Sequence, residues 1–176
     1  SWREAIDAGG VTPARVLGVA QASHALGDTQ SAEEAFLQAA ELDPDSARAA
    51  LGLGQLYTDA GRFDEARPWL TRAVALEPAN PDSKRELAIA LGRAGDASAA
   101  LELLKAAELT GGAAPELHSA RAVILGASGD ASGARASLRS AVELDPVDAV
   151  LRLELATAHE LGGDLELHQR EPGASP

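Results

Sequence analysis

Glycine recurs at one fixed interval through most of this 176-residue chain. The glycines stand 34 residues apart, at Gly27, Gly61, Gly95, Gly129 and Gly163. A period of about 20 to 50 residues is typical of repeat architectures, in which similar units stack and each unit contacts its neighbours. We therefore expect a row of stacked units rather than a fold built around one central core.

Other residue types repeat in the same register, and we call each set of residues 34 positions apart a column. Two columns contain alanine: Ala32, Ala66, Ala100 and Ala134, and Ala39, Ala73, Ala107 and Ala141. A third column is bulky and apolar: Phe36, Leu70, Leu104 and Leu138. Close helix crossings require alanine, because a longer side chain would push the two axes apart. The bulky column is expected to fill the space between neighbouring units.

One period is long enough for two helices and two turns, as residues 47–80 illustrate. An apolar stripe at helical spacing predicts the first helix: Leu51, Leu53, Leu56 and Tyr57. Gly61 is expected to end that helix in the left-handed conformation. Asp64 is predicted to cap the second helix, and Pro78 to stop it. Asn80 and Pro81 then predict the start of the following helix.

This pattern resembles the tetratricopeptide repeat family. The residues that carry the resemblance best are Leu53-Gly54, Tyr57, Ala60-Gly61-Arg62-Phe63, Ala66, Leu70, Ala73 and Pro78. The resemblance implies an all-α fold, a right-handed α-solenoid of stacked antiparallel helix pairs. It divides the chain into an N-terminal capping helix or half repeat (1–12), four repeats (13–46, 47–80, 81–114 and 115–148), a C-terminal capping helix or incomplete fifth repeat (149–169) and a linker or tail (170–176).

Two positions depart from the family pattern. The third repeat has Thr110-Gly111-Gly112 where a proline-containing turn is usual, which predicts a looser exit from its second helix. The fourth repeat has Arg121 where the first helix usually carries leucine, so the packing there is expected to shift to neighbouring apolar residues such as Leu117 and Ile124.

Charge and composition argue against several classes of partner. The chain has 15 Lys and Arg against 27 Asp and Glu, a formal net charge of −12, and no cysteine. Because nucleic-acid binding depends on basic residues that neutralise phosphates, we expect no nucleic-acid partner, and RNA recognition by a helical-repeat code is disfavoured. No apolar stretch is long enough to span a bilayer, so membrane insertion is not expected. The compartment stays open, with a soluble cytoplasmic location favoured over a periplasmic one.

The residues that often carry catalysis or bind metals are scattered here. The histidines are His24, His118, His159 and His168, and none is paired at the spacing of a zinc-binding helix. The serines at 128 and 132 fall in a predicted turn, and no nucleophile elbow is present. We therefore predict a chain that is not an enzyme, with no catalytic residues, no metal site and no cofactor.

What remains is a surface, and the family resemblance implies where it lies. Tetratricopeptide arrays generally bind a peptide or helix of a partner protein in a concave groove lined by their first helices. Carrying those positions over predicts a groove formed by Leu17, Gln21, His24, Arg48, Leu51, Gln55, Arg85, Ile89, Arg93, Ser119, Val123, Leu153 and Thr157. The same face also carries Asp59, Asp82, Glu116 and Glu160, so the groove is expected to be closer to neutral than the whole chain.

Arginine stands out among these positions. Arg85 and Arg93 are eight residues apart on one predicted helix, which places them on nearly the same face, and Arg48 lies on the preceding first helix. They could together bind an acidic side chain or a C-terminal carboxylate. The alternative is that they pair within the chain, with Asp59, Asp82 or Glu86.

The sequence therefore predicts a non-catalytic scaffold that binds a partner peptide or helix in its concave groove. The alternative is the accessory domain of a larger enzyme or of an assembly or secretion factor, whose activity lies outside this chain. The absence of methionine and the linker-like end favour an excised domain. Self-association through the ends of the solenoid is a further partner hypothesis.

Overall fold

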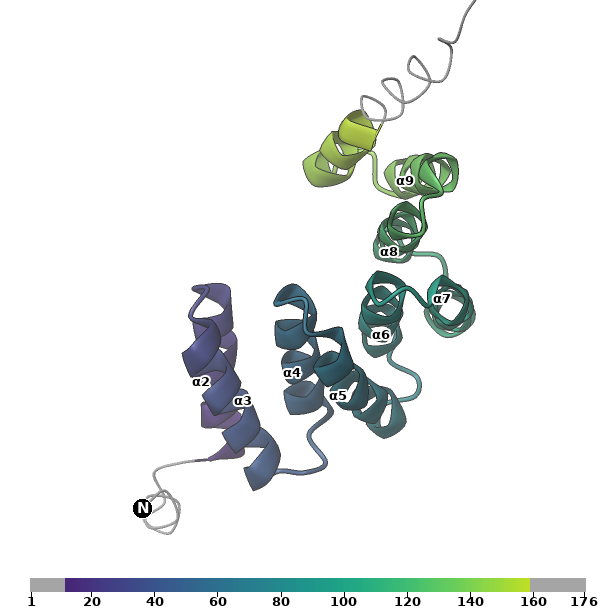
Figure 1. Ribbon diagram of the computed structural model, residues 1–176. Helices are drawn as coiled ribbons and strands as arrows, with labels where there is room; N and C mark the ends of the chain where they lie inside the picture. The colour runs from purple at the N-terminus through teal and green to yellow at the C-terminus, as the bar shows by residue number, and fades with distance from the viewer. Residues whose placement is uncertain (1–11, 159–176) are drawn as a thin grey trace, which may run out of the picture.

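The structure is a computed structural model, and it describes residues 12–158 (Figure 1). Every regular element in that range is α-helical. The helices are α2 (Pro13–Ala25), α3 (Thr29–Leu42), α4 (Ala47–Asp59), α5 (Phe63–Leu76), α6 (Pro81–Arg93), α7 (Ala97–Gly111), α8 (Pro115–Ala127) and α9 (Ala131–Leu144). Residues 149–158 are also helical. The predictions that fall on residues 1–11 and 159–176, including those for His159, Glu160 and His168, lie outside the described residues.

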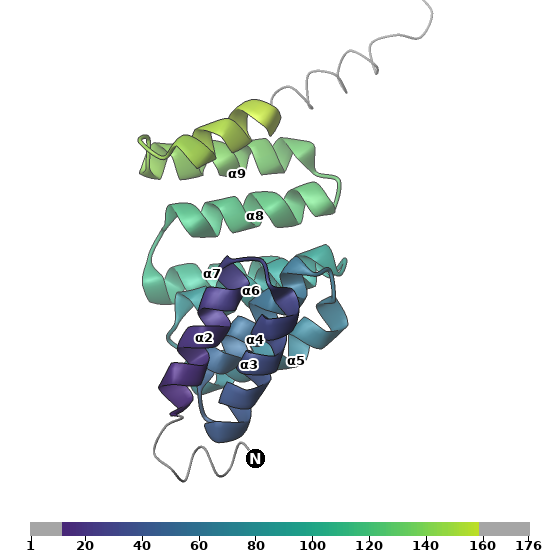
Figure 2. The same ribbon diagram turned by 90° about the vertical axis from the view of Figure 1, so that its left-hand side faces the viewer.

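The helices form antiparallel pairs that stack one after another, α2 with α3, α4 with α5, α6 with α7 and α8 with α9 (Figures 1 and 2). Along the stack the first helices contact one another: α2 contacts α4, α4 contacts α6 and α6 contacts α8. Within 12–158, no two second helices make a comparable contact. The predicted all-α solenoid is confirmed, and its first helices form one continuous face.

Glycine closes the turn inside each pair, as the period predicted. Gly27, Gly61, Gly95 and Gly129 have φ between 72° and 97°, the left-handed region that favours glycine. At Gly61 the chain reverses through a hydrogen bond from the Arg62 backbone N–H to the Tyr57 carbonyl (2.8 Å). This bond satisfies a carbonyl that the end of α4 would otherwise leave without a partner.

The start of the second helix was predicted two residues too late. Asp64 lies in the first turn of α5, and Arg62 occupies the N-cap position without a side-chain capping bond. In the same column, Asp28, Asp96 and Asp130 each accept a capping bond from the backbone N–H three residues on. The physical reason is that the left-handed glycine reverses the chain in one step, so the residue after it is already the cap.

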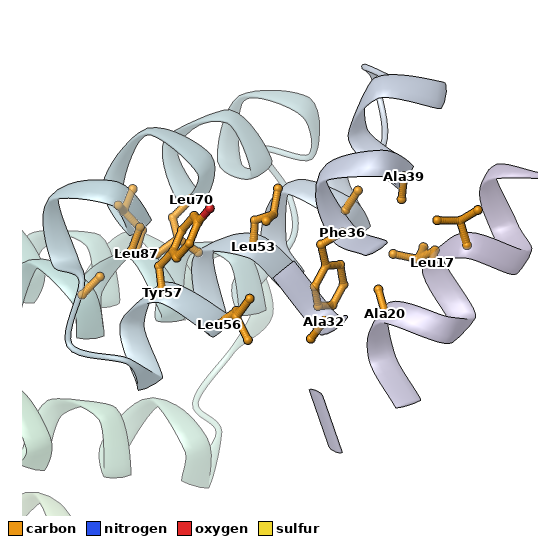
Figure 3. Close-up of a cluster of buried hydrophobic side chains, with 14 residues drawn as sticks. Leu17, Ala20, Ala32, Phe36, Ala39, Leu53, Leu56, Tyr57, Leu70 and Leu87 are labelled. Carbon is orange, nitrogen blue, oxygen red and sulfur yellow. The ribbon is translucent and has the colours of Figure 1, made fainter. Parts of the chain in front are cut away.

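The hydrophobic core lies between the first and the second helices, and the alanine columns are buried in it. The largest fully buried side chain of the described residues is Phe36, which reaches from α3 to α4 (Figure 3). A Cβ atom on Gly52 of α4 would overlap the Phe36 ring, and one on Gly54 would overlap Leu70. The bulky column thus packs against glycine or alanine on the first helices, and this allows close approach of the helices.

The two departures from the family pattern have local solutions. α7 runs on to Gly111 and ends at Gly112, which has φ +81°, and the following helix α8 begins without a side-chain cap. Arg121 is half-buried and forms an ion pair with Glu108 of α7 (2.6 Å). Leu117 and Ile124 are buried, as expected from the missing leucine.

Candidate partner-binding groove

In the described part of the chain, the face formed by the first helices has hollows at either end, and most of the predicted groove residues line two of them. We call the first the N-terminal hollow. It lies between α2 and α4, has a volume of about 290 Å³, and is lined by Gln21, His24, Ala25, Phe36, Arg48, Leu51, Gly52 and Gln55. Five of these residues were predicted from the sequence. Phe36 was assigned only to packing between units.

The polar groups of the N-terminal hollow come from both of its first helices. His24 Nε2 lies 3.2 Å from Asp59 Oδ2, which links the C-terminal ends of α2 and α4. The His24 ring also meets Phe36 edge-on, with ring centroids 6.3 Å apart. Arg48 is exposed and forms no ion pair or hydrogen bond with any residue of 12–158. The hollow therefore combines an apolar base with one available guanidinium group.

We call the second hollow the C-terminal hollow. It has a volume of about 300 Å³ and lies where α6, α8 and residues 149–158 meet. Its lining is Arg85, Ile89, Pro115, Glu116, Ser119, Ala120, Val123, Asp145, Asp148, Val150, Leu151 and Glu154. Four of these are predicted groove residues: Arg85, Ile89, Ser119 and Val123. The carboxylates of this hollow outnumber its single arginine.

The three groove arginines do not form one cluster. Arg85 pairs with Asp82 (2.7 Å) and with Glu86 (3.0 Å), so the intramolecular alternative describes this residue. Arg48 lies in the N-terminal hollow. Arg93 is exposed at the end of α6 and lines neither hollow. The three side chains are therefore not arranged as a single carboxylate grip, and Arg48 and Arg93 are the members without a partner in the described part of the chain.

The remaining predicted positions divide into core and open surface. Leu17 is 8% exposed and belongs to the hydrophobic core beside Phe36, so it offers little area to a partner. Leu153 is 65% exposed. Thr157 is exposed and donates its hydroxyl hydrogen to carbonyls of its own helix. Ser119 donates to Glu154 Oε2 (3.2 Å), which ties α8 to residues 149–158.

Three acidic residues that line the C-terminal hollow were not predicted from the sequence: Asp145, Asp148 and Glu154. Asp148 begins the final described helix, where its carboxylate accepts the backbone N–H groups of Val150 and Leu151, and it also lines the C-terminal hollow. Glu154 follows Leu153 by one residue and also lines it. The signal was present, since an aspartate that directly precedes an apolar helical stripe is a typical N-cap.

A separate polar cluster joins the first two helix pairs. Tyr57 donates its hydroxyl hydrogen to Glu33 Oε1 (2.9 Å), and Arg62 binds both Glu33 (3.0 Å) and Glu65. The Arg62 guanidinium lies 4.4 Å from the centre of the Tyr57 ring. Burial raises the pKa of Tyr57 to about 12, and the Glu33 carboxylate adds to this shift. None of its side chains lines either hollow, whereas Arg62 and Glu65 line a separate pocket of about 310 Å³ beside the Gly61 turn.

Two classes of site are absent from the described residues. Between 12 and 158, no group of three or more acidic or histidine side chains is placed to hold a metal ion. No helix in this range is long and apolar enough to cross a membrane.

The sequence matches models of a known protein family. One model described as tetratricopeptide repeat matches residues 20–83 and 119–167, and a second with the same description matches residues 59–124. A search of curated protein sequences found no significant match.

Solved structures share the fold at low sequence identity. A thermophilic TPR protein of Thermus thermophilus is 22% identical, with a TM-score of 0.75 over 89% of this chain and 86% of its own. PilF of Pseudomonas aeruginosa is 16% identical, with a TM-score of 0.70 over 86% of this chain and 69% of its own. An O-GlcNAc transferase of Thermobaculum terrenum is 24% identical, with a TM-score of 0.67, and the match covers 74% of this chain but 26% of the transferase.

Proposed function

The chain belongs to the tetratricopeptide repeat family, and from that premise we propose that it is a non-catalytic scaffold whose concave face binds a peptide or helix of a partner protein. A protein-interaction role is typical of the family. The proposal adds the surface: the face formed by α2, α4, α6, α8 and residues 149–158.

One observation carries this proposal. Nine of the thirteen groove residues predicted from the sequence line two hollows on that face, five in the N-terminal and four in the C-terminal hollow. The N-terminal hollow combines apolar side chains such as Leu51 with amides and a guanidinium. The C-terminal hollow combines apolar side chains such as Ile89 with a hydroxyl and charged groups. Binding sites for partner segments typically have this combination, in which apolar area supplies affinity and a few polar groups supply orientation.

Filling the hollows tests the proposal without changing charge. Peptides are first selected on the wild-type chain from a randomised display library, and their affinities are measured by calorimetric titration. Gln55→Trp fills the N-terminal hollow and Ser119→Trp the C-terminal hollow. We expect the double variant to lose at least about tenfold in affinity, or about 1.4 kcal/mol.

The matched controls place the same substitutions on second helices. Gln30 of α3 and Ser98 of α7 are exposed, and neither lines a hollow. Gln30→Trp with Ser98→Trp should leave the affinity unchanged, and circular dichroism checks that all variants remain helical. Equal binding by the hollow-filling variant and the wild type, or failure to select any peptide, would contradict the proposal.

A second candidate is supported by one comparison. The Thermobaculum terrenum transferase has a region similar to this chain that is about a quarter of its length. By analogy, this array would be the accessory domain of a larger enzyme or assembly factor and would present a substrate or subunit to it. Sequencing the open reading frame around these residues tests this candidate, because the candidate requires an enzyme or assembly-factor domain in the same chain.

A further inference from the structure

The two hollows carry opposite charge, and one column shows this most clearly. Arg48 on α4 and Glu116 on α8 are 68 residues apart, two full periods, so they occupy equivalent positions in their helix pairs. Both side chains are exposed, and each lines one of the hollows. Neither forms an ion pair or a side-chain hydrogen bond with another residue of 12–158.

The N-terminal hollow presents a net positive charge. Its other polar side chains are the amides of Gln21 and Gln55 and the imidazole of His24. No carboxylate is among its lining residues; that of Asp59 contacts His24 at 3.2 Å but does not line the hollow. Phe36 and Leu51 also line the hollow, so the Arg48 guanidinium shares it with apolar side chains.

The C-terminal hollow presents a net negative charge. Its one arginine, Arg85, is already compensated by Asp82 and Glu86. Four carboxylates remain in the lining: Glu116, Asp145, Asp148 and Glu154. Those of Asp145 and Asp148 accept backbone N–H bonds that fix their positions. The partly exposed Ile89 and Val123 and the exposed Val150 supply apolar area to the same lining.

We infer that the groove binds a partner segment whose own charges are segregated, and binds it in one direction. The occupant is a peptide with apolar residues at its centre, carboxylates towards one end and lysine or arginine towards the other. Its acidic end lies at Arg48 between α2 and α4, and its basic end lies at Glu116 and Glu154. The inference rests on the proposed function, and its basis is charge complementarity along one apolar face.

Charge reversal at the two matched positions tests the inference. The probe is a peptide selected on the wild-type chain, resynthesised with a photoreactive phenylalanine analogue beside its acidic residues. Arg48→Glu and Glu116→Arg should each lower its affinity about tenfold at low salt, with a smaller loss at high salt. Crosslinks mapped by mass spectrometry should fall on α2 and α4 in the wild type, and should move to α8 in the double reversal.

Two controls carry the same charge changes on second helices. Arg67 of α5 and Glu102 of α7 are exposed and line neither hollow. Arg67→Glu and Glu102→Arg should leave both the affinity and the crosslinks unchanged.

The outcomes separate this inference from the function on which it rests. If charge reversal has no effect while the hollow-filling Gln55→Trp and Ser119→Trp variant loses binding, the groove is used but its charge does not orient the partner. Crosslinks at both ends of the groove in the wild type would overturn the inference in the same way. If neither set of variants affects binding, the proposed function fails as well.

Discussion

At the scale of single residues, the informative positions are those where a column changes residue type. The residue after the turn glycine is aspartate in three helix pairs and caps the second helix, but it is Arg62 in the second pair. There the chain gives up a capping bond, which is worth about 1 kcal/mol. Arg62 binds Glu33 of the preceding pair instead and covers the Tyr57 ring. At this position a capping hydrogen bond within one helix is thus replaced by an ion pair between two helix pairs.

Tyr57 gives this cluster a direct spectroscopic readout, because it is the only tyrosine in the chain. Burial and the Glu33 contact raise the pKa of Tyr57 to about 12, whereas an exposed tyrosine has a pKa of about 10. A pKa raised in the folded state contributes stability that is fully present below about pH 10 and is lost as the pH rises through about 12. We therefore expect the free energy of unfolding to fall over that window.

The near-ultraviolet absorbance of phenolate measures this titration in the native protein. Tyr57→Phe should remove the contribution of this residue to the alkaline slope and keep the helical content at neutral pH. Phenolate appearing near a pH of about 10, the value for an exposed tyrosine, while the circular dichroism spectrum stays native would show that Tyr57 is not buried against Glu33.

At the scale of helices, glycine has different consequences at equivalent positions. Gly18 of α2 and Gly52 of α4 belong to one column. A Cβ atom on Gly18 would meet nothing within 4 Å, whereas one on Gly52 would overlap the Phe36 ring. Glycine is therefore required at position 52, where a larger residue would overlap Phe36. At position 18 nothing requires it, and it only weakens the helix.

Alanine at each position tests this difference. Gly18→Ala should raise the free energy of unfolding by about 0.5–1 kcal/mol, because alanine is the better helix former. Gly52→Ala should lower it by about 1–3 kcal/mol, because Phe36 must move. Urea unfolding followed by circular dichroism measures both changes. Changes of the same sign in both variants would contradict the packing of α3 against α4.

Periodicity predicted the helices well because each unit obeys the same local rules. The glycine turns, the buried alanines and the helix start at Asn80 and Pro81 follow from residues that are near in sequence. Asp64 was assigned the cap because single-helix signals favour an aspartate. Comparison along the column would have pointed to position 62, since its equivalents are three aspartates.

At the scale of the whole molecule, the groove could be predicted only in part. The helix positions that face it were carried over from the family resemblance, and nine of the predicted residues line the hollows. The sequence pattern does not tell which of these residues are buried in the core or paired with other residues of the chain. Leu17 is in the core, and Arg85 is held by Asp82 and Glu86, because these outcomes depend on how adjacent pairs pack. The segregation of charge between the hollows likewise emerges only when the units are stacked.

The net charge of −12 for the whole chain does not describe the local charge of the partner-binding surface. An average over the chain conceals a guanidinium available in the N-terminal hollow and an excess of carboxylates in the C-terminal hollow. Under the proposed function, overall acidity would keep the scaffold soluble, while the local arrangement of charge selects and orients the segment that it binds.

We propose that the face formed by the first helices binds the partner. The most direct measurement is a nuclear magnetic resonance titration of the isotopically labelled chain with a selected peptide. We expect backbone amide shifts to change along α2, α4, α6 and α8, with the largest changes around Arg48, Gln55, Ser119 and Val123. Changes confined to α3, α5, α7 and α9 would place the partner on the opposite face and contradict the account.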